Sequence, residues 1–101
     1  MITPGTTPEH IFKLPMPVDS VKSIRIFYTV DSNVILQKET NDITLDGAFI
    51  RLTLTQEDTL KLRGATKVVI QVQCLSSDDN AFMSYPFHVA VGESAASEVL
   101  T

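Results

Sequence analysis

The sequence has little of what disulfide-stapled, membrane-spanning and nucleic-acid-binding proteins are built from. Its 101 residues include one cysteine, which excludes an internal disulfide and with it the small secreted proteins that depend on several. No apolar run approaches the ~18 residues that a membrane-spanning helix needs. Eight basic residues stand against twelve acidic ones, for a formal net charge of −4, so no basic lobe is present to contact phosphates. We therefore expect neither a membrane span nor a nucleic-acid partner.

Motifs for catalysis and metal binding are missing as well. The chain has four glycines and no glycine-rich phosphate loop, nucleophile elbow or metalloprotease helix motif. Cys74 is in phase with apolar residues of its strand, which predicts a buried and inert thiol. His10 and His88 are too few and too isolated for a metal site, and Asp78–Asn80 lacks the spacing of a calcium loop. We expect no catalytic residue, metal or cofactor, although carboxylates paired by the fold for glycoside chemistry remain open.

What the chain does contain is enough apolar material for one core. Its apolar fraction of 44% and charged fraction of 20% are near the averages of globular domains. A chain of this size buries roughly 60–70% of its unfolded surface, which suffices for folding without staples. We expect one domain over residues 1–92, with an N-terminal arm, followed by a flexible polar tail over residues 93–101.

Seven segments show the alternation, or the β-branched and aromatic content, of strands. The predicted strands are 9–14, 21–31, 34–39, 43–45, 48–54, 67–75 and 81–91. Turn residues separate most of them, and Asp46-Gly47 predicts a type I′ hairpin turn. Pro86 interrupts the last segment, which places that strand at a sheet edge or marks a bulge.

One segment changes period and predicts a short helix over residues 56–62. Thr55 can cap its start, and Asp58 three residues on completes a capping-box arrangement. Strands joined by such a crossover are typical of an immunoglobulin-like (Ig-like) antiparallel β-sandwich, although the cysteine pair and tryptophan of antibody domains are missing. The shared phase of the strands predicts these core residues: Phe12, Ile24, Ile26, Tyr28, Leu52, Leu54, Ile70, Val72 and Phe87.

Two phenylalanines lie out of phase with this core. Phe27 and Phe49 stand opposite the main apolar set of their strands, on the same faces as Arg25 and Arg51 respectively. In an Ig-like order we expect strands 21–31 and 48–54 to be antiparallel neighbours in one sheet, so that the four side chains form a single outward surface. Aromatic and arginine side chains are enriched at protein interfaces, so we predict association through this surface. The alternative is a monomer in which residues 1–8 cover the phenylalanines.

Four segments resemble small phage and prophage proteins of tail and baseplate gene clusters in Gram-positive bacteria. They are Thr3–Pro15, Ile24–Tyr28, Leu52–Leu60 and Val68–Gln73, and the similarity covers roughly residues 3–92, nearly the whole chain. The predicted fold also resembles the Ig-like N-terminal domain of phage baseplate upper proteins.

The resemblance implies a non-catalytic structural role in tail or baseplate assembly. Its partners would be other tail or baseplate proteins, or further copies of this chain in a homo-oligomer. The protein would occur in the cytoplasm of the bacterial host during assembly and then in the virion. The alternative function is a small Ig-like recognition module for a cell-surface carbohydrate or protein, which the absence of tryptophan disfavours.

Overall fold

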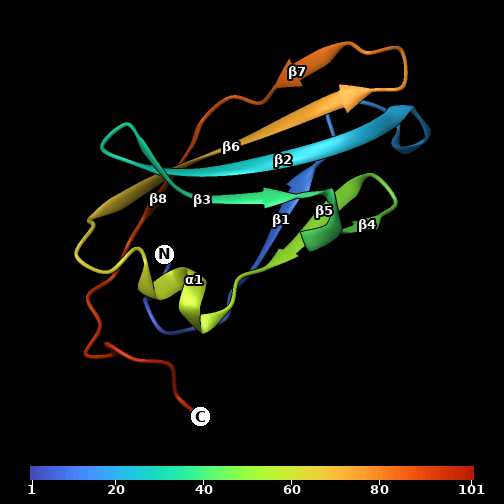
Figure 1. Ribbon diagram of the computed structural model, residues 1–101. Coiled ribbons are helices and arrows are strands. Elements are labelled where there is room, and N and C mark those ends of the chain that lie inside the picture. The colour runs from blue at the N-terminus through green and yellow to red at the C-terminus, as the bar shows by residue number, and fades with distance from the viewer.

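Two antiparallel sheets pack face to face in the computed structural model, which describes all 101 residues (Figure 1). The strands are β1 (Glu9–Lys13), β2 (Val21–Val30), β3 (Asn33–Glu39), β4 (Thr44–Asp46), β5 (Phe49–Thr53), β6 (Lys67–Ser76), β7 (Ala81–Met83) and β8 (Phe87–Ala90). Helix α1 (Gln56–Leu60) connects β5 to β6, and short 3-10 turns span Val18–Ser20 and Thr40–Asp42. None of these helices has the length and apolar character needed to cross a membrane.

The order of the strands is that of an Ig-like sandwich. One sheet has the order β1-β5-β4, and the other has the order β3-β2-β6-β7, with β8 also paired to β6. These positions correspond to strands B-E-D and C′-C-F-G of Ig domains, with β7 and β8 sharing the place of G. The prediction of an all-β, Ig-like antiparallel sandwich is therefore confirmed. No strand takes the place of A, so one edge of β1 has no neighbour.

The core lies between the sheets and follows the predicted phase. Every predicted core residue is buried except Phe87, whose side chain is 44% exposed. Phe87 pairs with Ile70 and packs on the ring of Phe12 at a centroid distance of 5.7 Å, so it faces the interior. It lies on an edge strand that the N-terminal arm covers only at the Ala90 end, which is why the prediction of its burial was wrong.

The last predicted strand divides at Pro86. Residues 81–83 and 87–90 form β7 and β8, which both pair antiparallel with β6. Between them, the Ser84 hydroxyl accepts a hydrogen bond from the backbone N–H of Val72 at 2.9 Å. Proline has no N–H to donate, and the prediction of an edge position or a bulge is confirmed.

The turn between β4 and β5 differs from the predicted one. Asp46 pairs with Phe49 in the ladder, so Gly47 and Ala48 are the two turn residues. Gly47 has a φ of 58°, whereas Ala48 has no positive φ, which excludes type I′. Glycine at the first central position is the arrangement of a type II′ turn. The β2–β3 turn, by contrast, has positive φ at both Asp31 and Ser32.

The N-terminal arm and the C-terminal segment both pass near α1, with the N-terminus above the helix and the C-terminus below it in the view of Figure 1. Ile2 bridges Val91 in parallel, and the Ser94 hydroxyl donates a hydrogen bond to the carbonyl of Pro4 at 2.8 Å. Farther along, the backbone N–H of Leu100 donates to Gln56 Oε1 at 2.7 Å. The segment that we expected to be a flexible tail thus has hydrogen bonds to both the arm and the helix, and its flexibility stays a prediction.

Candidate interaction surface

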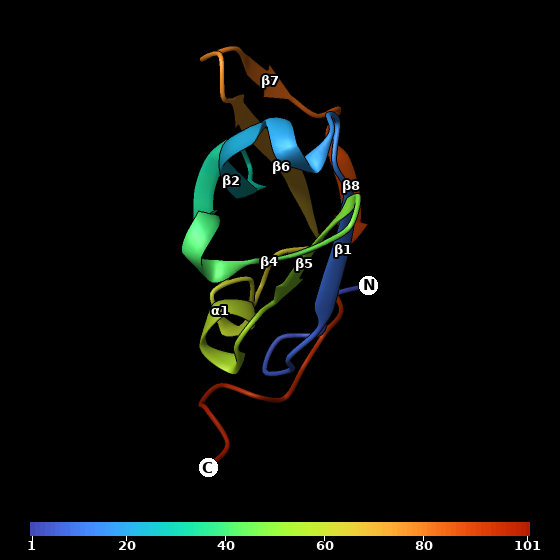
Figure 2. The same ribbon diagram turned by 90° about the vertical axis from the view of Figure 1, so that its right-hand side faces the viewer.

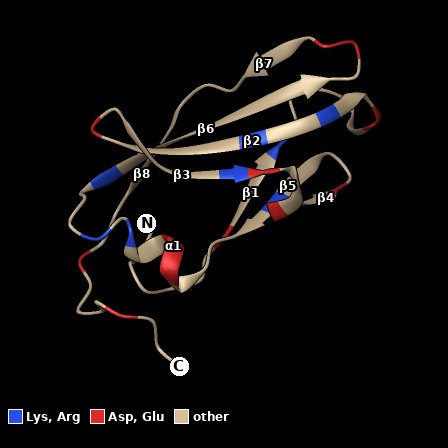
Figure 3. Ribbon diagram, viewed as in Figure 1, with Lys and Arg blue, Asp and Glu red and all other residues tan.

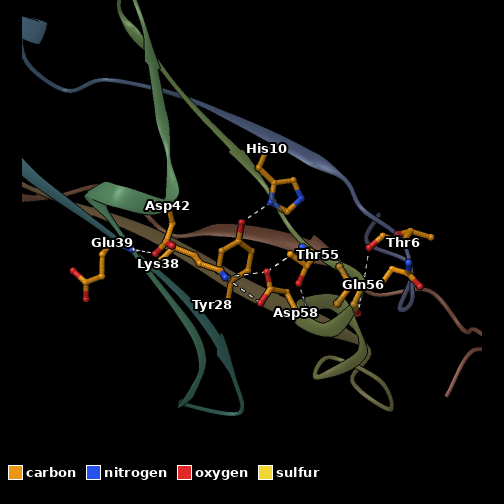
Figure 4. Close-up of polar contacts among 10 residues, drawn as sticks. Thr6, His10, Tyr28, Lys38, Glu39, Asp42, Thr55, Gln56 and Asp58 are labelled. Atoms are coloured by element: carbon orange, nitrogen blue, oxygen red, sulfur yellow. Dashed lines mark hydrogen bonds and ion pairs between the residues drawn. The ribbon is translucent and has the colours of Figure 1, made fainter. Parts of the chain in front are cut away.

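A partly buried polar cluster joins the two sheets to helix α1 (Figure 4). His10 of β1 and Tyr28 of β2 share a hydrogen bond of 2.5 Å between Nδ1 and the hydroxyl, and their rings stack. Lys38 of β3 donates to both carboxylate oxygens of Asp58, at 3.0 and 2.9 Å. The Asp58 carboxylate accepts from the Thr55 N–H at 3.0 Å, and the Thr55 hydroxyl accepts from the Asp58 N–H at 3.1 Å. The predicted capping box is therefore confirmed.

Burial and hydrogen bonds together determine which side chains of this cluster are charged. Burial, reinforced by the Asp58 carboxylate, raises the pKa of the Tyr28 hydroxyl, whereas burial and the N-terminal charge lower the pKa of His10. Burial alone would raise the pKa of Asp58, but hydrogen bonds from Thr55 and Lys38 outweigh it and lower that pKa. At neutral pH the cluster thus contains a neutral tyrosine, a neutral histidine and one ion pair.

The cluster has a structural role. Tyr28 has no exposed surface, so a substrate has no access to its hydroxyl. Every buried side-chain nitrogen and oxygen of the chain has a hydrogen-bond partner. The cluster fixes α1 against β3 and fixes β1 against β2, and we assign it no chemistry.

The residues weighed in the sequence for metal or nucleophile chemistry are separate from one another. Cys74 is fully buried, as predicted, and burial raises the pKa of its thiol. No group of three or more histidine, cysteine or acidic side chains is placed to hold a metal. In the exposed loop after β6, Asp78 accepts a hydrogen bond from the Ser76 hydroxyl.

The structure does not bring the predicted interface residues together. Arg25 and Phe27 are on β2, whereas Phe49 and Arg51 are on β5, and these strands belong to different sheets. Because β2 takes the place of C rather than B in the Ig order, the outward faces of the two strands point to opposite sides of the sandwich. The prediction of one surface that contains all four side chains was wrong.

The four predicted interface residues also differ in their contacts: the two arginines form ion pairs, and the two phenylalanines lie in different sheets. Arg25 donates to Glu39 at 3.1 Å, and Arg51 donates to both Glu9 and Asp46 at 2.9 Å. Charged residues are distributed over strands and loops of both sheets (Figure 3). Phe27 is half-buried between the neighbouring strands, while Phe49 is 46% exposed on the other sheet.

An apolar groove opens instead along one edge of the sandwich, between β1 and β8. It has a volume of about 520 Å³, and we call it the β1–β8 groove. Its apolar lining residues are Met1, Ile2, Ile11, Phe12, Ile70, Phe87 and Val89. Figure 2 shows β1 and β8 next to each other at the right-hand edge of the molecule, near the N-terminus. The half-exposed ring of Phe87 is a direct result of this opening.

The β1 side of the groove has unpaired backbone groups. Leu54 donates to the Pro8 carbonyl and Leu14 donates to the Ala48 carbonyl, so the even-numbered residues of β1 point their backbone groups toward β5. The N–H and C=O groups of an antiparallel strand alternate between its two sides. Those of Glu9, Ile11 and Lys13 therefore point away from the sheet, at an edge that no strand covers.

On the β8 side, the N-terminal arm covers part of the edge. The Ile2 N–H donates to the Ala90 carbonyl at 2.9 Å, and the Gly92 N–H donates to the Ile2 carbonyl at 2.8 Å. The exposed side chain of Met1 lies over Gly92, where a Cβ would come within 2.6 Å of the Met1 sulfur. Toward Pro86 the edge is open, and Tyr85 next to it is 90% exposed.

Sequence reasoning missed this edge. Ile11 is 51% exposed and stands on the polar face of β1, and this out-of-phase isoleucine was the available signal. Which edge of a strand is unpaired depends on the strand order, and the strand order is not written in the local periodicity.

Comparisons with known proteins add little to this description. No family model and no curated protein sequence matches the chain. Among solved structures, the V domain of amphioxus IgVJ-C2 is similar at a TM-score of 0.35 and 13% identity, covering 88% of this chain and 95% of that one. A likeness this weak has no weight for fold or function, and the Ig-like assignment rests on the strand order.

Proposed function

We propose that this chain is a non-catalytic association domain, a structural component of a phage or prophage tail or baseplate that binds other proteins of the assembly. The single observation that supports association is the β1–β8 groove, where apolar side chains lie beside an unpaired strand edge. The tail or baseplate setting comes from the resemblance of the sequence segments described above.

The physical argument starts from the cost of leaving such an edge in water. An unpaired strand edge is a template for another strand, and soluble proteins normally keep it short, charged or covered. A partner that covers the exposed apolar surface next to this edge removes that surface from water, which stabilises the complex. A protein that is built into an assembly has such a partner, and strand addition at a sheet edge is a common way of binding one.

The test is the composition of particles. Phage particles and tail intermediates from an induced host carrying the gene should contain the chain by mass spectrometry, and the flanking genes should encode tail proteins. Lysate from the same host with the gene deleted is the control. Absence of the chain from both particles and tail intermediates would contradict the proposal.

A recognition module for a cell-surface carbohydrate or protein is the second candidate, and one observation favours it. Tyr85 is 90% exposed, with the half-exposed ring of Phe87 close to it in the sequence. Aromatic side chains with a polar tip are suited to contacts that are partly apolar and partly wet. Binding on a glycan array that Tyr85→Ala abolishes would support this function, and an array without signal would argue against its carbohydrate form.

A further inference from the structure

We propose that two copies of this chain pair edge to edge through β1, antiparallel and centred on Ile11, so that their three-stranded sheets become one continuous sheet. The inference rests on the proposed function, since it names a second copy of the chain as the partner at the unpaired edge. The resulting two-fold dimer would have the same surface patch on both sides, as closed homodimers do.

The backbone restricts the possible registers. Only Glu9, Ile11 and Lys13 point their N–H and C=O groups outward. In an antiparallel pair, residues that exchange both hydrogen bonds stand directly opposite each other, so these outward residues must face one another. Centring on Ile11 sets Glu9 opposite the partner's Lys13, Ile11 opposite the partner's Ile11, and Lys13 opposite the partner's Glu9.

The side chains then select this register from the few that the backbone permits. Opposite charges directly across a strand pair are favourable and like charges are unfavourable. Centring on Glu9 or on Lys13 would set each of these charges against its own copy. Centring on His10 or on Phe12 would set Ile11 opposite a charged side chain of the partner. Centring on Phe12 would also place Pro15, which has no N–H, in the ladder. The register centred on Ile11 alone satisfies both charges and the isoleucine.

Charge in the single chain is consistent with this pairing. Lys13 is exposed and has no ion pair, while Glu9 is bound on one side by Arg51. Lysine on an edge strand usually prevents edge-to-edge pairing. Here the same lysine opposes the wrong registers and, in the symmetric register, meets a carboxylate.

The groove supplies the apolar part of the contact. Pairing at β1 brings the partner's Phe12 next to His10 on the inner face, above the groove that Phe12 and Phe87 line. Ile11, half-exposed on the outer face, is covered by its own copy. Pro8 and Pro15 bracket β1, so the paired segment is short, and we expect a reversible dimer that dissociates on dilution.

Charge reversal on the full chain tests the register by sedimentation equilibrium. Glu9→Lys sets two like positive pairs across the edge and Lys13→Glu sets two like negative pairs, so each variant alone should dimerise at least about tenfold more weakly than wild type. A mixture of the two variants should form a heterodimer, because every facing pair is then of opposite charge. The double variant should dimerise again. Lys61→Glu, on the exposed face of the α1 region, is the matched control and should dimerise as wild type does.

Circular dichroism of each variant checks that loss of the dimer is not loss of the fold. A wild type that is monomeric up to about millimolar concentration would overturn the inference, and so would single variants that dimerise as strongly as wild type. A monomeric wild type that is nevertheless found in tail particles would reject self-pairing and leave the proposed function intact. A wild type that forms the dimer but is absent from particles would support self-pairing and reject the proposed function.

Discussion

Asp58→Ala should destabilise the fold by about 2–4 kcal/mol. The change removes the carboxylate that accepts from the Thr55 N–H and from Lys38. Thr55 still caps the helix in this variant, but the reciprocal hydrogen bond from the Thr55 N–H is lost, which contributes ~0.5–1.5 kcal/mol. The side chains of Lys38 and Asp58 are only 20% and 9% exposed, so the ammonium that remains is left largely without water or a partner. Breaking a fully buried pair costs ~3–5 kcal/mol, and the partial access of Lys38 to solvent reduces this figure.

Urea unfolding at pH 7, followed by far-ultraviolet circular dichroism, measures this loss. Glu57→Ala is the matched control, because Glu57 is exposed in the same helical turn and its removal should change stability by less than about 0.5 kcal/mol. A loss below about 1 kcal/mol for Asp58→Ala, with an unchanged dependence on urea, would refute the reasoning.

The destabilisation should also depend on pH. The pKa of Asp58 is lowered in the folded protein, so folding favours the ionised carboxylate. Its contribution is therefore fully present above the unfolded pKa of about 3.9 and is lost as the pH falls through the lower folded pKa. The difference in stability between wild type and Asp58→Ala should shrink over this acid range. A constant difference would mean that the ion pair contributes nothing.

Three further predictions concern the cap, the core and the histidine. Thr55→Ala should cost ~0.5–2 kcal/mol in the same urea assay, and Thr55→Ser should be nearly neutral; equal losses would argue against the cap. Ile70→Ala should cost ~2–5 kcal/mol, against less than about 1 kcal/mol for the exposed Val34→Ala, and a small loss at Ile70 would contradict its burial. Because burial lowers the pKa of His10, folding favours its neutral form, so wild-type stability should fall as the pH drops below about 6.5. His10→Gln should flatten this part of a thermal-unfolding pH profile, and an unchanged profile would contradict the assignment.

Local patterns in the sequence predicted much of the fold. The alternation around Ile26 and Ile70 placed both residues in the core, where both are buried. The spacing of Thr55 and Asp58 predicted the capping box, because a cap is formed by residues within one turn of each other. Such features depend on near neighbours in the chain, which is why sequence alone suffices for them.

Features that depend on strand order could not be predicted in the same way. Period two tells which residues share a face of a strand, but it does not tell which strands are neighbours. Phe27 and Phe49 were therefore placed on one surface, although their strands lie in different sheets. For the same reason the pairing of His10 with Tyr28 and the unpaired edge of β1 emerged only from the structure.

Amide hydrogen exchange by NMR, at low and high protein concentration, tests the central claim of association through the β1 edge most directly. The amides of His10 and Phe12 point toward β5 and should be protected at every concentration. Those of Glu9, Ile11 and Lys13 should exchange fast in the dilute protein and become protected as its concentration rises. Fast exchange of these three amides at every concentration would contradict self-association through this edge.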